Sequence, residues 1–129
     1  MADLDSITLP ADPTTLAPDG SDVRVLLGLA GGSMAHFSLA PGQVSGAVRH
    51  RTVEEIWYVV AGRGRMWRQQ GDRSSLVDLV AGTCLTIPLG TDFQFRCDGT
   101  ERLEVVGVTM PPWPGDDEAI AVEGCADWT

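Results

Sequence analysis

Turn-forming glycines and prolines divide this chain at intervals of roughly 8–12 residues, a spacing typical of β-sandwiches and barrels. The runs between the turns are rich in β-branched and aromatic residues, and they cover residues 23–29, 34–39, 55–60, 65–69, 76–80, 83–87, 93–97 and 102–109. No window of about 11 residues carries an apolar stripe with the helical period. With 129 residues, the chain is predicted to form one all-β domain with a single core.

Both ends of the chain differ from this pattern. Residues 1–22 contain several prolines and predict an extended N-terminal arm. Residues 23–110 then form the predicted barrel, and residues 111–129 form a proline-rich C-terminal tail. In the tail, residues 116–123 have room for one short helical turn at most.

Trp113 lies in this tail between prolines that force an extended path. A side chain of this size needs a burial site. We expect the tail to pack across the barrel, and the alternatives are a lid over a cavity mouth or a clasp on a partner subunit.

The charge balance excludes some classes of partner. Nine basic residues, all arginine, stand against 18 acidic ones, giving a net charge of −9. Such a surface repels nucleic acid and anionic membranes. No apolar run approaches the ~20 residues that cross a bilayer, and the acidic start does not resemble a secretory signal. We therefore expect a cytoplasmic protein with no nucleic-acid or membrane partner.

The three cysteines, Cys84, Cys97 and Cys125, include no C-x-x-C pair. An odd count argues against a disulfide framework. Since Cys84 and Cys97 lie in apolar strand patterns, we expect both to be inert core residues.

One predicted strand, residues 56–60, is apolar on both faces. Such a strand is covered on both sides, so its outer face needs the arm, the tail or a second subunit. Because large exposed apolar patches are rare on monomers, this pattern favours a homodimer.

Two segments between residues 42 and 97 resemble the paired motifs of the cupin superfamily. In the first motif, G-x5-H-x-H-x4-E-x6-G, the matching residues are Gly42, His50, Glu55 and Gly62. In the second, G-x5-P-x-G-x2-H-x3-N, they are Gly82, Pro88 and Gly90. The resemblance implies a small single-domain cupin: a double-stranded β-helix (jelly-roll) barrel with an extended N-terminal arm and a Pro-rich C-terminal tail.

The ligand positions of these motifs are only partly kept. Metal-binding cupins hold a divalent metal with three histidines and a glutamate. Here Val48 and Phe93 stand at two of the histidine positions and Cys97 at the closing Asn position, which leaves His50 and Glu55. A mononuclear catalytic site usually needs three protein ligands, so we expect no resident cofactor.

The alternative is a divalent metal (Mn, Fe, Ni or Zn) with an atypical ligand set. His36 is the only other histidine. If its strand turns it inward, His36 joins His50 and Glu55 in a two-histidine, one-carboxylate site. A lone histidine on a half-polar strand is more often a surface or hydrogen-bonded residue.

Strand alternation predicts which side chains surround the remaining pair. Residues two apart share a face, so Val48 accompanies His50 and Trp57 accompanies Glu55. The expected substrate-binding residues are Val48, Trp57, Phe93, Phe95 and Cys97. A mostly apolar cavity with two polar groups is typical of a small-molecule pocket.

The sequence therefore predicts a small-molecule-binding cupin in which His50 and Glu55 serve as catalytic acid and base. The reaction would be of the isomerase, epimerase, cyclase or dehydratase type, on an apolar or aromatic metabolite. Two alternatives remain open: a metal-dependent oxygenase or isomerase, and a non-catalytic ligand-sensing cupin. The sequence does not decide whether the protein is an enzyme.

Overall fold

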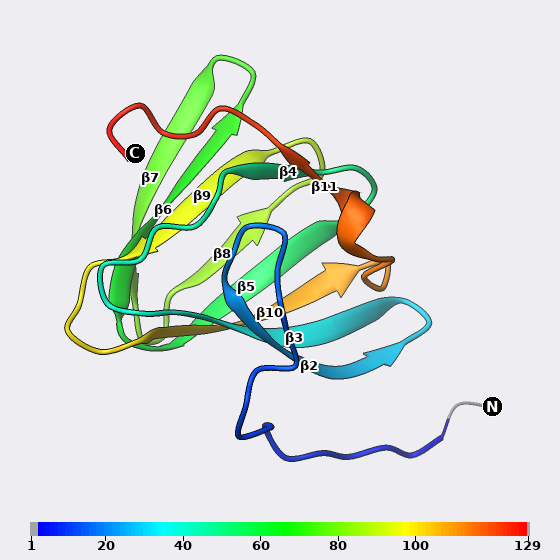
Figure 1. Cartoon of the computed structure of the whole chain (residues 1–129). Helices are drawn as coiled ribbons and strands as arrows, with labels where there is room; N and C mark the ends of the chain where they lie inside the picture. The colour runs from blue at the N-terminus through cyan, green and yellow to red at the C-terminus, as the bar shows by residue number, and fades with distance from the viewer. Residues whose placement is uncertain (1–2, 129) are drawn as a thin grey trace.

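Two antiparallel sheets face each other in the computed structural model, which describes residues 3–128 (Figure 1). The first sheet has the order β1 (Thr15–Leu16), β2 (Asp22–Leu29), β3 (Gly32–Leu39), β10 (Leu103–Met110), β5 (Glu54–Ala61) and β8 (Cys84–Ile87). The second has the order β11 (Ala119–Ala121), β4 (Val48–His50), β9 (Asp92–Cys97), β6 (Arg63–Gln70) and β7 (Arg73–Val80). The predicted all-β barrel is confirmed. No helix within the described part of the chain is both long enough and apolar enough to cross a membrane.

All eight predicted runs form strands, while three further strands were not predicted. β1, β4 and β11 have only two or three residues each, too few for an alternating pattern. β1 pairs with the strand that follows it, β2, whereas β4 pairs with β9 and β11, which lie far along the chain. The short 3-10 helix η1 (Asp116–Glu118) precedes β11.

The core lies between the sheets and follows strand alternation. On β5, Trp57 and Val59 point inward and are at most 2% exposed, whereas Ile56, Tyr58 and Val60 point outward and are 43%, 50% and 48% exposed. The inner residues join a cluster from both sheets that includes Leu39, Met66, Leu79, Phe95 and Leu103. Within one chain, β5 is therefore covered on its inner face and half-exposed on its outer face.

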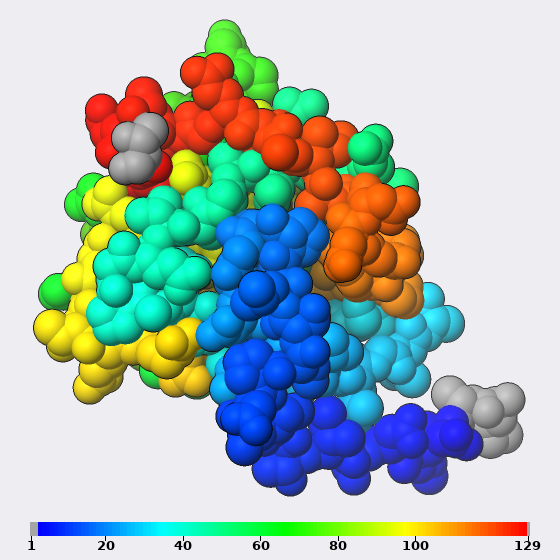
Figure 2. Space-filling model, in the orientation of Figure 1, coloured from blue at the N-terminus to red at the C-terminus, as the bar shows by residue number. Residues whose placement is uncertain are grey.

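The arm crosses the open side between the two sheets. Arg24 holds its outer part by donating hydrogen bonds from Nε to the Pro10 carbonyl (2.8 Å) and from Nη2 to the Ala11 carbonyl (3.0 Å). Further along, the Gly46 amide donates to the Asp19 carbonyl at 2.7 Å, which ties the arm to the segment before β4. In Figure 2 this blue segment lies beside the orange tail. Residues 1–2 of the predicted arm and residue 129 of the tail lie outside the described part.

The cysteine prediction is half right. Cys97 is buried, but Cys84 is exposed and Cys125 is half-buried. Cys84 begins β8, in which Leu85 and Ile87 take the inward positions, so alternation places Cys84 outward.

The four motif glycines all have positive φ: 80° at Gly42, 86° at Gly62, 95° at Gly82 and 83° at Gly90. Glycine populates this region readily, whereas other residues are strained there. Gly62, in the β5–β6 turn, has a second constraint, because a Cβ would collide with the Arg102 carbonyl and with Cα of Leu103.

We predict that Gly62→Ala lowers the free energy of unfolding by more than about 2 kcal/mol, since it adds this collision to the φ penalty. The matched control is Gly71→Ala, where φ is 58° and nothing lies within 4 Å of an added Cβ. Its loss is expected near 1 kcal/mol. Urea denaturation of both variants measures the difference, and equal losses would contradict the proposed collision.

Candidate functional site

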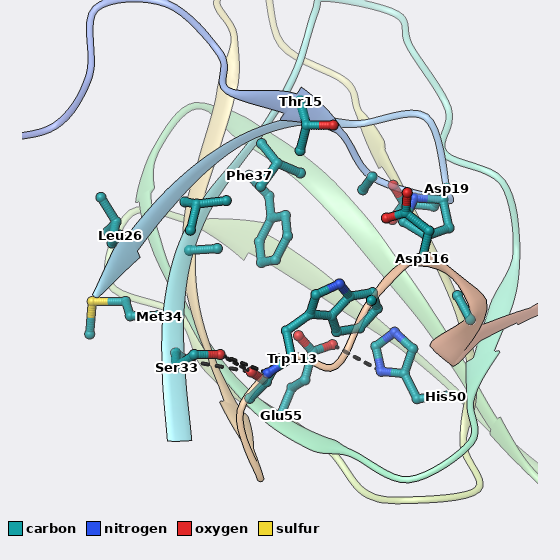
Figure 3. A pocket seen from close by; sticks show the side chains of 18 of the residues that line it. Thr15, Asp19, Leu26, Ser33, Met34, Phe37, His50, Glu55, Trp113 and Asp116 are labelled. Atoms are coloured by element: carbon teal, nitrogen blue, oxygen red, sulfur yellow. Dashed lines mark hydrogen bonds and ion pairs between the residues drawn. The ribbon is translucent and has the colours of Figure 1, made fainter. Parts of the chain in front are cut away.

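A cavity of about 340 Å³ opens between the two sheets under the arm and the tail (Figure 3). Its walls are mainly apolar and come from β2, β3, β5, β4 and β9, with the arm segment 15–19 and the tail residues Trp113, Gly115 and Asp116 around the mouth. The volume is at the lower end of the range of small-molecule sites.

His50 and Glu55 are the polar pair inside this cavity. His50 ends β4 and Glu55 is the second residue of β5, so the pair joins the two sheets. His50 Nδ1 lies 3.4 Å from Glu55 Oε2, and the side chains are only 8% and 2% exposed. The contact lacks the angles of a hydrogen bond, and neither atom has another partner among the described residues. Both atoms are therefore buried without a hydrogen-bond partner in the described part of the chain.

Burial shifts the two groups in opposite directions. Burial, opposed by the indole N–H of Trp57 and assisted by the charge of Asp19, raises the pKa of Glu55 to about 8. Burial also lowers the pKa of His50 to about 4, and the charge of Glu118 offsets only part of this effect. At neutral pH the pair thus consists of a protonated carboxyl and a neutral imidazole, which are a proton donor and a proton acceptor side by side.

Aromatic rings surround the pair. Trp57 stacks on Phe37 with 5.2 Å between ring centroids and an interplanar angle of 20°. The His50 ring lies between Phe93 and Trp113, which contact it edge-on at centroid distances of 5.2 and 5.1 Å. Such contacts position the imidazole without using its nitrogen atoms.

Gly107 on β10 makes room for this aromatic layer, and sequence reasoning missed it. A Cβ at Gly107 would lie 2.9 Å from both the Phe37 ring and the Trp57 indole. The signal was one glycine inside an otherwise β-branched run, which often marks a close approach.

Hydrogen bonds at two points, Trp113 and Glu118, hold the tail over the cavity. The Trp113 amide donates to Ser33 Oγ at 3.0 Å, and that hydroxyl also contacts Thr109 Oγ1 at 2.6 Å. Further along, the Glu118 carboxylate accepts hydrogen bonds from the Thr52 amide (2.6 Å), the Thr52 hydroxyl and the Val53 amide (3.1 Å). Although burial raises the pKa of Glu118, these hydrogen bonds outweigh it and the net shift is downward.

The tail therefore packs across the barrel and also borders the cavity through Trp113. The sequence singled out Trp113 but not Ser33, Thr109 or Glu118. Their roles depend on partners more than 60 residues away in the chain, which no local pattern reveals.

Of the predicted lining residues, the structure places Val48, Trp57 and Phe93 on the cavity wall. Phe95 and Cys97 lie outside the lining. Phe95 packs edge-on against Trp57 at 4.9 Å, and Cys97 Sγ donates to the Glu101 carbonyl at 3.2 Å. Both belong to the buried core rather than to the cavity.

His36 is not brought to the pair. It lies on the outer side of the first sheet, where its Nε2 is 3.1 Å from Glu104 Oε1. It borders a separate hollow together with Met34, Val60 and Val106. The atypical ligand set of His36, His50 and Glu55 is therefore not assembled, because His36 and the pair lie on opposite faces of the sheet.

The fold and the motif glycines define a double-stranded β-helix protein. A sequence model of the cupin domain matches residues 35–109, more than half of the 129-residue chain. The chain belongs to the cupin family. No curated protein sequence matches it.

Several solved structures share the fold. Oxalate decarboxylase from Bacillus subtilis aligns with a TM-score of 0.72 at 16% identity, over 86% of this chain and 30% of that one. The capsular polysaccharide assembling protein CapF from Staphylococcus aureus aligns with a TM-score of 0.70 at 17% identity, over 80% of this chain and 32% of that one. An uncharacterized protein with a double-stranded beta-helix domain from Klebsiella pneumoniae aligns with a TM-score of 0.65 at 21% identity, over 80% of this chain and 84% of that one. The chain spans about a third of the length of the first two, and these likenesses show the fold alone.

The Bacillus subtilis oxalate decarboxylase contains Mn(II) centres. The described residues hold no cluster of three or more His, Cys, Asp or Glu side chains. Val48 and Phe93 are register partners on β4 and β9, and they present only carbon to the cavity beside His50. A site with three protein ligands does not fit these residues.

We predict that the stability of the protein falls between about pH 6.5 and 8. In this window the folded chain retains the Glu55 proton that the unfolded chain has released, so raising the pH favours unfolding. The free energy of unfolding is expected to fall by about 1–2 kcal/mol over this window. Glu55→Gln should abolish this pH dependence. Urea unfolding of both proteins at pH 6.5 and 8 measures the difference, and parallel pH profiles would contradict a proton held on Glu55.

Proposed function

We propose that this cupin binds an apolar, ring-bearing small molecule in its cavity and that His50 and Glu55 act on it as base and acid. The observation that carries the proposal is the polar pair enclosed in a mainly apolar cavity, with His50 Nδ1 and Glu55 Oε2 free of other partners among the described residues. Convergent polar groups in an apolar pocket are the usual mark of a binding site.

The aromatic layer supports a ring-bearing ligand. Phe37, Trp57, Phe93 and Trp113 all line the cavity. Flat side chains of this kind stack on or meet the edge of a planar ligand with favourable geometry. The ligand's polar end would then lie at the His50–Glu55 pair.

The pair is suited to moving a proton within a carbonyl compound. His50 takes a proton from the carbon beside the carbonyl group while Glu55 gives its proton to the carbonyl oxygen, which yields the enol. Return of a proton to the other face or to another carbon gives an epimer or isomer and restores both side chains. The step uses no oxidant or reductant, and proton transfers of this kind contribute about 10²–10⁴-fold to rate.

The test uses 2-tetralone, an aryl-fused ketone with exchangeable C–H bonds, in D₂O. We expect the protein to accelerate deuterium exchange beside the carbonyl, followed by NMR, and Glu55→Gln and His50→Gln to reduce this acceleration by at least about 100-fold. Binding, followed by tryptophan fluorescence, should survive in both variants.

Two substitutions of alanine by phenylalanine test whether binding and exchange take place in this cavity. Ala35 lines the cavity, so Ala35→Phe should abolish both binding and exchange. Ala30 lies exposed in the β2–β3 turn, and Ala30→Phe should preserve both. Binding without exchange in the unmodified protein would reject the acid–base role and favour the non-catalytic ligand-sensing alternative.

We also propose that two copies of the chain pair through the outer face of β5, formed by Ile56, Tyr58 and Val60. The arm, the tail or a second subunit could cover this face. The tail instead extends the second sheet through β11, and the arm residues Ile7 and Leu9 border a hollow that reaches only Val60. A second copy is the remaining cover for this half-exposed apolar face.

Size-exclusion chromatography with light scattering should give a mass near twice 13.8 kDa. Tyr58→Glu places a charge in the contact and should produce monomers. Leu76→Glu, at an exposed apolar position on β7 of the other sheet, should remain dimeric. A monomeric unmodified protein would reject the dimer.

A further inference from the structure

The ionisable side chains that line the cavity are acidic, apart from His50. Among the described residues 3–128, none of the nine arginines lines it. Several are engaged elsewhere: Arg49 with Asp92 at 2.6 Å, Arg65 with Asp78 at 3.1 Å and Arg102 with Asp22 at 2.7 Å. The cavity therefore offers no guanidinium to a carboxylate or a phosphate.

Acidic side chains occupy both its rim and its interior. Asp19 borders the mouth from the arm, where its Oδ1 accepts hydrogen bonds from the Ser21 amide (2.9 Å) and hydroxyl (2.7 Å). Asp116 borders the mouth from the tail and is exposed. Glu55, 3% exposed, lies inside. In Figure 3, Asp19 and Asp116 face the same opening above His50.

Within residues 3–128, His50 is the only lining residue able to carry a positive charge, and it already faces a carboxyl group. Its Nδ1 is 3.4 Å from Glu55 Oε2, and at neutral pH the imidazole is uncharged and the carboxyl protonated, so the pair supplies no cation to a bound anion. A bound anion would lie in an apolar enclosure beside acidic groups, without a free cation. Burying an unpaired charge in such surroundings is strongly unfavourable.

The unpartnered polar atoms suit a neutral polar group. Trp57 Nε1 makes no hydrogen bond of standard geometry among the described residues, and neither do His50 Nδ1 and Glu55 Oε2. The Trp57 N–H is directed at Glu55, whose pKa it lowers, so the donor and the acceptor come from the Glu55 carboxyl and the His50 imidazole. An amide, ketone or hydroxyl group on a ring can pair with these atoms without bringing in a charge.

From this arrangement we propose that the cavity selects uncharged ring-bearing ligands and rejects anionic ones of the same shape. The inference rests on the proposed binding function and defines its ligand class. It separates this cavity from sites built to recognise carboxylates or phosphates, which use arginine or lysine.

Benzamide and benzoate test the inference, because they have nearly the same shape and differ in charge at pH 7.5. Ligand-observed NMR titration of the full chain should show benzamide binding at least about tenfold more tightly than benzoate. Benzoate binding as tightly as benzamide would overturn the inference but leave cavity binding intact. Failure of both compounds to bind would overturn the proposed binding function and the inference with it.

A charge change at the mouth provides the matched variants. Asp116→Arg supplies the missing cation, and it should reduce the ratio of benzamide affinity to benzoate affinity by at least about threefold. Asp117→Arg makes the same charge change one residue further along η1, at an exposed position outside the lining. Asp117→Arg should leave this affinity ratio almost unchanged. Equal changes of the ratio in the two variants would reject selection by the charges that line the mouth.

Discussion

The enclosed cavity depends on the three hydrogen bonds that the Glu118 carboxylate accepts at the start of β5. They fix the tail between β10 and β11, so that Trp113 lies over the cavity with its amide on Ser33. The Trp113 ring then packs against His50 and helps to exclude water from the polar pair. Because burial is the main cause of both pKa shifts in the pair, a contact outside the cavity contributes to the proton chemistry inside it.

The same barrel supports different chemistry when the inner face of a few strands changes. Val48 and Phe93 lie opposite each other on β4 and β9, at positions where metal-binding cupins carry histidines. Their carbon side chains convert a polar metal pocket into an apolar wall and leave His50 and Glu55 without a third donor. A carboxyl group that metal binding would keep ionised is instead retained as an acid.

The structural relatives illustrate why the fold cannot assign the activity. Oxalate decarboxylase and CapF align with this chain at TM-scores of 0.72 and 0.70, with identities of only 16% and 17%. Their names describe unrelated tasks, so the function has to be argued from the side chains that line this particular cavity. Here those side chains are mainly aromatic and aliphatic, with a few hydroxyl and acidic groups and one histidine.

The sequence by itself determined the barrel, its eight longer strands and the positions of His50, Glu55, Val48, Trp57 and Phe93 on the cavity wall, because strand alternation and turn glycines are local properties. Only the tertiary structure decided that His36 faces away from the pair, that Phe95 and Cys97 belong to the core, and that Cys84 is exposed. It also decided the close packing at Gly107 and the fixing of the tail by Glu118. These features depend on which sheet face each strand presents and on partners distant in the chain, and one residue of register or one long-range contact changes them without altering the local pattern.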